Sequence, residues 1–428
     1  MVKIEPFEVE QWMDRLETTP GVLNIAETCA ASVSVDDLVR MCEDKDAPGP
    51  LSLSNKLTYG AIRGSETLRQ RVAALYGRAS NAEPLSAENV IITQGAIAAN
   101  FLTLYTLVGP GDHVICVYPT YQQLYSVPES LGAEVSLWKL KKENGYIPDV
   151  AELEGLVKDN TKVCSPSPSP HDGPLTLTVP AHQMIIINNP NNPTGSTIPT
   201  ATLTQIVAFA QHHNLTILSD EVYSPLYHSL PPQHQPAPPS ILAFDYPKTI
   251  ATGSMSKAFA LAGIRTGWIA TRDQQIIESL AAARDYTTIS VSQLDDQVAR
   301  YALSPAVAAP LLARNTALAR ANLELLGGFV EKYAGVCKWT RPTAGTTALV
   351  QFWSAREGGG PVDDERFVMD VLEKTKVLVM PASPCFGLGR DFKGFVRMGY
   401  VCETEVLVEG LERLGRYVEE YLMKKRKN

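Results

Sequence analysis

The sequence predicts an α/β fold that combines a large domain on a mostly parallel sheet with a second, smaller α/β domain. Short apolar segments alternate with amphipathic helical segments through the middle of the chain. The apolar segments are nearly continuous, as in strands that are covered on both faces. At 428 residues, of which 45% are hydrophobic and 20% charged, the chain is long enough for two or three domains with sizeable cores.

Six apolar segments are predicted as buried strands, and amphipathic helices lie between several of them. The predicted strands are Asn89–Thr93, His113–Tyr118, Met184–Asn188, Leu215–Ser219, Thr249–Thr252 and Gly267–Ala270. The clearest helices are Ala96–Val108 and Thr200–His213. In a sheet of this kind the ligand binds beyond the carboxyl ends of the strands, so we look there for chemistry.

The pattern changes from about Ser292, where the chain becomes helical before strands return after Lys338. Strands are predicted at Thr347–Phe352, Val377–Met380 and Gly394–Met398, and a final helix from Glu403 to about Met423. We therefore expect residues 51–291 to form the large domain and residues 292–428 the small one. Residues 1–50 contain too little to fold alone, and we expect them to pack on the small domain.

Two segments rich in Pro, Ser and His interrupt the pattern. They are Cys164–His182 and His228–Pro239. Their composition is typical of surface insertions that contribute little to a core.

Charge and cysteine content restrict the partners and the location. The formal net charge is −8, so no broad cationic field is available for nucleic acid or an anionic membrane surface. The seven cysteines are scattered, without a C-x-x-C motif, so neither a disulfide framework nor a zinc site is expected. With no apolar run near the roughly 20 residues of a membrane helix and no leader-like N-terminus, we expect a cytoplasmic protein.

The segment Thr252–Ile269, TGSMSKAFALAGIRTGWI, contains the most informative residue, Lys257. Apolar Phe259 and Leu261 follow closely, and a partly desolvated amine has a lowered pKa that suits it to form a Schiff base with a carbonyl. Nearby side chains suited to binding a phosphate are Ser254, Ser256 and Arg265.

This segment resembles the lysine motif of the class I/II aminotransferases, which are fold-type I enzymes dependent on pyridoxal 5′-phosphate (PLP). Two further motifs stand before it in the family's order, NPNNPTG at Asn189–Gly195 and SDEVY at Ser219–Tyr223. The resemblance implies a seven-stranded large sheet, PLP as cofactor, α-amino acid substrates and a homodimer with shared active sites.

The resemblance also implies roles for individual residues near the cofactor ring. Lys257 would form the Schiff base and act as general base. Asp220 would pair with the protonated pyridine nitrogen and keep the ring an electron sink. Asn192 and Tyr223 would hydrogen-bond the phenolic oxygen, and Tyr121 would stack on the ring.

The remaining roles concern the phosphate and the substrate. Gly95 and Ala96, where a strand passes into a helix, would present backbone N–H groups to the phosphate. Tyr59 would reach the phosphate bound by the neighbouring subunit. Arg397, in GFVRMGY, would hold the substrate α-carboxylate as a bidentate pair beside Asn192.

The reaction type remains open between two readings. Transamination is the leading one. However, ENGYIPD at Glu143–Asp149 and ARDYTTISVSQL at Ala283–Leu294 resemble the capreomycidine synthase group, which cyclises a hydroxylated arginine by β-elimination and addition. Departures from the common aminotransferase pattern stand at Leu23–Thr28 (LNIAET) and Pro381–Gly387 (PASPCFG). There Glu27 is either a contact for a cationic substrate side chain or a surface carboxylate.

Overall fold

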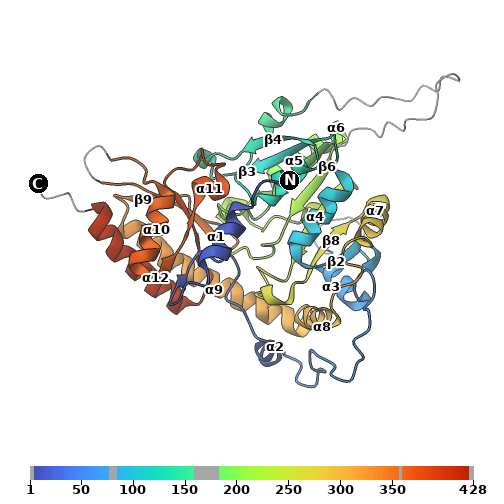
Figure 1. Ribbon diagram of the computed structural model, residues 1–428. Coiled ribbons are helices and arrows are strands. Elements are labelled where there is room, and N and C mark those ends of the chain that lie inside the picture. Colours follow the sequence, from blue (N-terminus) through green and yellow to red (C-terminus); the bar gives the residue numbers. More distant parts are fainter. Residues whose placement is uncertain (1–3, 77–83, 159–182, 356–358, 424–428) are drawn as a thin grey trace, which may run out of the picture.

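The computed structural model describes residues 4–76, 84–158, 183–355 and 359–423, which contain a seven-stranded sheet, a four-stranded sheet and a two-stranded one (Figure 1). The larger sheet has seven strands in the order β2-β8-β7-β6-β5-β3-β4, and only β8 runs antiparallel to its neighbours. The predicted mostly parallel, seven-stranded sheet is therefore confirmed. Its strands are β2 (Val90–Thr93), β3 (His113–Tyr118), β4 (Glu134–Lys139), β5 (Gln183–Asn188), β6 (Thr216–Asp220), β7 (Thr249–Ser254) and β8 (Gly267–Thr271).

The two faces of the larger sheet bury different side chains because successive residues of a strand point in opposite directions. On β5, Met184 and Ile186 join the core beneath the helices α4 (Gly95–Leu107), α5 (Gln123–Ser130) and α7 (Gln274–Arg284). Their neighbours Ile185 and Ile187 join the core on the other face, together with apolar residues of α6 (Thr200–His213). Burial on both faces explains why these strands are almost continuously apolar.

The smaller sheet has four antiparallel strands in the order β12-β13-β10-β9. These are β9 (Cys337–Trp339), β10 (Thr347–Phe352), β12 (Met380–Pro381) and β13 (Phe395–Gly399). The single strand predicted at 377–380 is instead two, because Val377–Leu378 forms β11 and pairs in parallel with β1 (Leu23–Asn24) outside this sheet. The helices α10 (Asp364–Thr375) and α12 (Thr404–Tyr417) pack on each other, and a π-helical turn at Val418–Met423 completes the predicted final helix.

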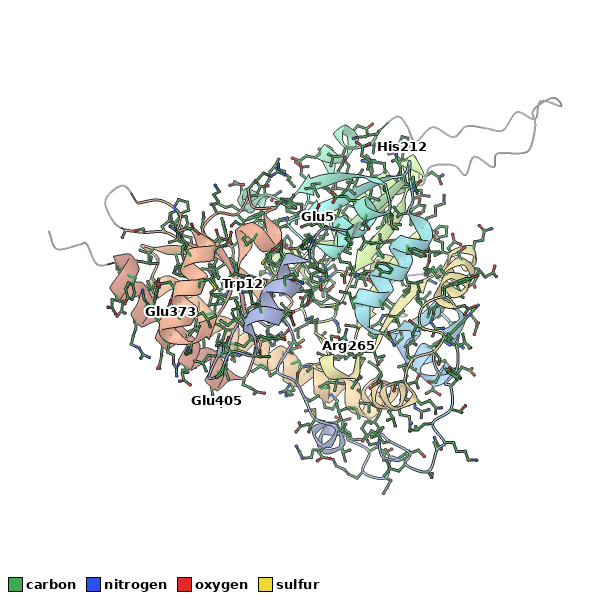
Figure 2. The ribbon with its side chains drawn as sticks, viewed as in Figure 1. Glu5, Trp12, His212, Arg265, Glu373 and Glu405 are labelled. Atoms are coloured by element: carbon green, nitrogen blue, oxygen red, sulfur yellow. The ribbon has the colours of Figure 1, made fainter. Side chains whose placement is uncertain are left out.

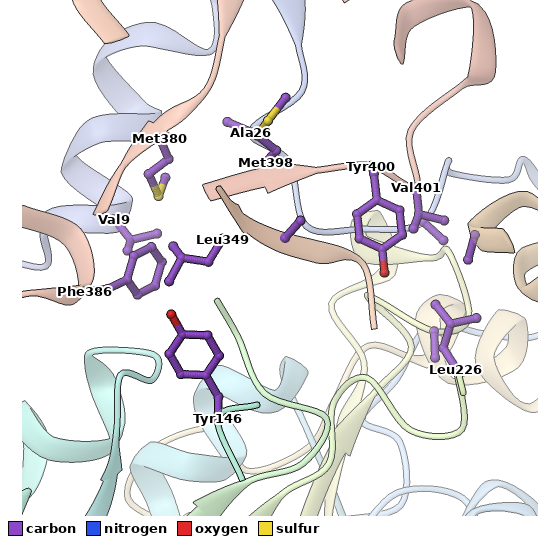
Figure 3. Close-up of a cluster of buried hydrophobic side chains, with 14 of the residues drawn as sticks. Val9, Ala26, Tyr146, Leu226, Leu349, Met380, Phe386, Met398, Tyr400 and Val401 are labelled. Carbon is purple, nitrogen blue, oxygen red and sulfur yellow. The ribbon is translucent and has the colours of Figure 1, made fainter. Parts of the chain in front are cut away.

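The N-terminal segment packs on two separate helices. Helix α1 (Glu8–Leu16) packs on α11 (Ala382–Phe386), while α2 (Val35–Met41) packs on the long helix α9 (Pro305–Lys332). Figure 3 shows Val9 of α1 beside Phe386 and Met380, with Tyr146 from the larger-sheet part facing the same cluster. The remaining α-helices are α3 (Glu66–Tyr76) and α8 (Gln293–Ala302), which contact each other. The domain boundaries at residues 50 and 291 stay a prediction.

The second Pro-rich segment, His228–Pro239, corrects one expectation. The first, Cys164–His182, lies outside the described residues. His228 is only 5% exposed, and its Nε2 lies 2.8 Å from the Tyr400 hydroxyl and 3.1 Å from the Gly345 carbonyl oxygen. The segment is therefore not a surface insertion at its start, because this histidine joins the two parts of the molecule. Among the described residues, no helix is long and apolar enough to cross a membrane.

Candidate active site

A cavity of about 710 Å³ lies beyond the carboxyl ends of β6 and β7, at the N-terminus of α4. Helix α1 and the segment 26–29 form the opposite wall. Most of the residues predicted from the sequence line this cavity: Ala96, Tyr121, Asn192, Asp220, Tyr223, Ser254, Ser256, Lys257, Arg265 and Arg397. Gly95 lies next to Ala96 at the helix start, whereas Tyr59 is 77% exposed and is not part of the lining.

Lys257 follows the last residues of β7, and its amine is held by the N-terminal segment. Nζ donates to Thr28 Oγ1 at 2.5 Å and lies 3.4 Å from Cys29 Sγ and 3.6 Å from Glu27 Oε1. Burial alone would lower the pKa of Lys257, but Cys29, Glu27 and Tyr223 together raise it above its usual value. The expectation of a lowered pKa is therefore wrong for this arrangement, since Cys29 and Glu27, which are more than 200 residues away in sequence, outweigh the effect of burial.

Glu27 is the most important residue that the sequence left undecided. Burial alone would raise its pKa, but the Lys257 charge and the Thr28 N–H, which donates to Oε1 at 2.5 Å, lower it to about 2. The carboxylate lines the cavity and pairs with Lys257, so it is not an isolated surface charge. The signal in the sequence was that Leu23–Thr28 (LNIAET) departs from the pattern of the common aminotransferases.

Asp220 ends β6 and is only 3% exposed. Asn100 of α4 donates to its Oδ2 at 3.0 Å, and the Thr252 hydroxyl in turn donates to Asn100 Oδ1 at 2.6 Å. Burial raises the pKa of Asp220 to about 6, and the bonds from the Val222 N–H and Asn100 limit that rise. Sequence reasoning missed Asn100, although an asparagine inside the apolar helix segment GAIAANFL was a visible signal.

The N-terminus of α4 is built for close approach of an anion. Gly95 has φ +79°, and a Cβ there would come within 2.8 Å of Arg265 Nη2. On β8, a Cβ on Gly267 would lie 2.6 Å from the Ala96 nitrogen, so only glycine lets this strand pass so near the helix start. Arg265 is labelled near the centre of the molecule in Figure 2. Sequence reasoning missed Gly267.

Arg397 on β13 brings an incompletely bonded guanidinium into the cavity. It is 2% exposed; Nη2 donates to the Ala26 carbonyl oxygen at 2.8 Å and Nη1 to Asn192 Oδ1 at 3.4 Å. Within the described part of the chain, Nε has no hydrogen-bond partner. A buried donor without a partner indicates a site that a carboxylate completes.

Two tyrosines complete the cavity. The Tyr121 hydroxyl donates to Glu10 Oε1 at 2.6 Å. This bond connects the residues just before α5 to helix α1. Tyr223 is buried, which raises its pKa, and it lies beside Gly345, whose φ is +70°. Neither hydroxyl is therefore ionised at neutral pH.

The donor set fits a phosphorylated pyridine aldehyde. A buried carboxylate at Asp220 suits a pyridinium N–H, the Lys257 amine suits the aldehyde, and the glycine-framed start of α4 suits the phosphate. Among the described residues, no group of His, Cys, Asp and Glu side chains is arranged to hold a metal ion.

Comparisons with known proteins agree with this site. The sequence model of the family described as aminotransferase class I and II matches residues 45–414. The chain therefore belongs to this family, and its cofactor is pyridoxal 5′-phosphate. The fold is that of fold-type I PLP enzymes.

Individual relatives point to more than one activity. Capreomycidine synthase of Streptomyces vinaceus is 26% identical over 364 residues, which cover 84% of this chain and 81% of that protein. A PLP-dependent aminotransferase of Streptococcus suis superposes with a TM-score of 0.81 at 33% identity and covers 99% of this chain and all of that one. The PLP-dependent cyclase OrfR, at 24% identity and a TM-score of 0.78 over 97% of both chains, shows the same fold.

Proposed function

We propose that this protein is an aminotransferase that removes the amino group of an α-amino acid and transfers it to a keto acid. The proposal rests on one observation, which is that the Lys257 amine, the Asp220 carboxylate and the incompletely bonded Arg397 guanidinium share a single cavity. These groups match the amine, the ring nitrogen partner and the carboxylate clamp that the reaction needs.

We assign substrate positioning to Arg397 and Asn192. Arg397 would take the α-carboxylate through Nε and one Nη, geometry that a lysine cannot provide. Asn192 already accepts from Arg397 Nη1 at 3.4 Å and would keep the guanidinium in its plane. Bound PLP supplies an electron sink that makes the Cα proton acidic.

We assign proton transfer at Cα to Nζ of Lys257. Thr28 Oγ1, at 2.5 Å, fixes the direction of this amine. Because Glu27 favours the charged form, the amine must lose a proton before it can act as a base, so activity should rise with pH. Asp220 would stay ionised opposite the ring nitrogen, and the phenol of Tyr223 would donate to the ring oxygen.

A substrate panel tests this proposal. Purified protein loaded with PLP is incubated with single amino acids, with and without a keto acid acceptor, and both products are measured. Amino transfer that depends on the acceptor supports the proposal. Consumption of an amino acid without any acceptor, with PLP unchanged, contradicts it.

Cyclisation of a hydroxylated arginine is the second candidate, and the charge of the cavity favours it. The carboxylates of Glu10, Asp14, Glu17 and Glu27 all line the cavity, and the pKa of Glu17 is raised by burial and by the other three. A guanidinium side chain would offset this mutual repulsion. Hydroxyarginine should then lose water and cyclise without an acceptor, whereas arginine should not.

We also propose that the protein is a homodimer and that it works in a reducing cytosol. Leu57, Tyr59 and Tyr286 are exposed by 68%, 77% and 93%, which is unusual for large apolar side chains. In the aminotransferase family that the chain resembles, the residue at Tyr59 of a second copy would reach the phosphate. The described cysteines are all free, in keeping with a reducing compartment. Sedimentation of the holoenzyme tests the dimer, and a monomer at every concentration contradicts it.

A further inference from the structure

The side of helix α1 that lines the active-site cavity carries three carboxylates. Glu10, Asp14 and Glu17 all line the cavity, and their spacing of four and three residues places them on one face of α1 and its C-cap. Glu10 accepts from the Tyr121 hydroxyl, which is a neutral partner. Among the described residues, Asp14 and Glu17 have neither an ion pair nor a side-chain hydrogen bond. Three negative charges therefore face the cavity from one helix.

Helix α1 does not compensate these charges itself. Arg15, its basic residue, has its guanidinium carbon 5.2 Å from the centre of the Trp12 ring and is not among the residues that line the cavity. Like charges three or four residues apart destabilise a helix, and a carboxylate at a helix C-terminus opposes the helix dipole. The pKa of Glu17 is accordingly raised, first by burial and then by Glu27 and the other two carboxylates. A cation bound in the cavity would remove this repulsion.

Arg397 gives independent evidence that a charged ligand enters the same cavity. Its side chain lines the cavity and is 2% exposed, and its Nε has no hydrogen-bond partner among the described residues. A buried guanidinium with a free donor indicates a carboxylate on the ligand. The cavity thus offers a positive group for one end of a ligand and a negative helix face for another.

We propose that the substrate is an amino acid whose side chain ends in a positive charge, and that Asp14 and Glu17 select it. The inference rests on the proposed function, because it takes Arg397 as the partner of the α-carboxylate. Selection by charge applies to transamination and to cyclisation alike, since the charge of the side chain does not depend on what happens at Cα. Asp14 and Glu17 are the determinants because they are the two carboxylates of this face without a partner.

The basic residues of the cavity exclude an acidic side chain. The lining contains three of them, Lys257, Arg265 and Arg397. Lys257 is paired with Glu27 at 3.6 Å, Arg265 suits the phosphate, and Arg397 suits the α-carboxylate. No basic side chain of the described lining is left for a second carboxylate, which would instead meet the acidic face of α1.

The test measures the binding of phosphopyridoxyl amino acids to apoprotein by calorimetry. In these stable conjugates the reduced cofactor is joined to the amino group, so binding is measured without any reaction. Two matched pairs differ mainly in charge: arginine with citrulline, and lysine with norleucine. In at least one pair the cationic conjugate should bind about tenfold more tightly or better, because several partly shielded ion pairs act together.

The outcomes separate this inference from the proposed function. Equal affinities within both pairs would overturn the selection of a cationic side chain and leave the proposed function standing. Failure of every conjugate to bind would overturn both. If the cationic conjugate is preferred but no amino acid gives acceptor-dependent transfer, the aminotransferase is refuted and the selection stands.

Variants of α1 test the assignment of the two carboxylates. Asp14→Asn and Glu17→Gln should each reduce the preference about two- to fivefold by weakening the cationic conjugate, while the neutral conjugate binds as in the wild type. Glu8→Gln is the matched control, because it removes the same charge from α1 at a position that does not line the cavity, and it should keep the full preference. An equal loss for both conjugates in Asp14→Asn and Glu17→Gln would show a structural role and contradict the assignment.

Two further measurements exclude a folding defect. Asp14→Asn and Glu17→Gln apoprotein should unfold at the same or a higher urea concentration than the wild type, since each change removes repulsion within α1. The wild-type preference should also decrease as salt rises from about 0.05 to about 0.5 M, because mobile ions screen charges near the surface. A marked loss of stability in the variants, or a preference that salt does not change, would contradict selection by these carboxylates.

Discussion

Replacing Asn100 by leucine tests whether this residue, which the sequence did not predict, controls the charge of Asp220. Asp220 is the expected partner of the pyridine nitrogen of PLP. The change keeps the side-chain size but removes the donor to Asp220 Oδ2 and the acceptor for Thr252 Oγ1. A hydrogen bond to a charged group contributes about 1.5–3 kcal/mol, and one pKa unit corresponds to about 1.4 kcal/mol. The pKa of Asp220, about 6 in the native chain, should therefore rise by about one to two units.

The consequence is a weaker hold on PLP near neutral pH. Only the ionised carboxylate can pair with a pyridinium, so affinity should fall as pH drops through the pKa of Asp220. At pH 7 most of the wild-type Asp220 is ionised, whereas in Asn100→Leu about half to nine-tenths of it would be protonated. PLP affinity at this pH should fall about two- to tenfold and recover by pH 9.

The assay is a titration of apoprotein with PLP at several pH values. Thr103→Val is the matched control, because it removes a buried hydroxyl from the same helix whose bond goes only to the Ala99 carbonyl oxygen. The ratio of variant to control cancels the titration of PLP itself. If the affinity of Asn100→Leu fell equally at pH 7 and pH 9, control of the Asp220 charge by Asn100 would be refuted.

Three other changes give independent checks. Lys257→Ala should show no PLP adduct by mass spectrometry after borohydride reduction, whereas the wild type should gain one; an adduct that persists in the variant would place the reactive amine elsewhere. Gly267→Ala, whose Cβ would lie 2.6 Å from the Ala96 nitrogen, should lose about 1–3 kcal/mol of stability together with PLP affinity, while Gly263→Ala, with open space around its Cβ, should lose neither. Burial raises the pKa of Glu221 to about 7, so the native carboxyl destabilises the fold as pH rises from 4.5 through 7. Glu221→Gln should accordingly gain up to about 3 kcal/mol over the wild type in urea unfolding at pH 8 but not at pH 4, and an equal gain at both pH values would show that its charge is not the cause.

Much of the larger sheet was predictable because its strands are buried on both faces. The strand at His113–Tyr118 has the predicted bounds, and the helix at Thr200–His213 does too. The strand β4 was missed because it lies at the sheet edge, where half-exposed and exposed residues break the apolar run. An apolar sequence pattern indicates burial, so strands that are only partly covered cannot be recognised from it.

The site was predictable where one motif carries the chemistry and unpredictable where distant segments meet. Residues at strand ends, such as Asp220 and Lys257, gather because parallel strands end at the same edge. The effect of Glu27 on the Lys257 amine depends on a contact between residues 230 positions apart, which no local pattern contains. The burial of His228 could not be predicted for the same reason, because the residues that contact it, Tyr400 and Gly345, are distant in the sequence.

The pairing of β1 with β11 has a consequence for how the chain reaches its native state during synthesis. Leu23 and Asn24 find their partners only when Val377 and Leu378 have left the ribosome. At roughly 5–20 residues per second, the first segment therefore waits on the order of half a minute with its apolar side chains exposed. The segment 26–29, which contacts the Lys257 amine, is therefore among the last parts to assemble. A truncated chain that lacks the C-terminal third should be unable to retain the cofactor. It should also need chaperones to prevent its aggregation.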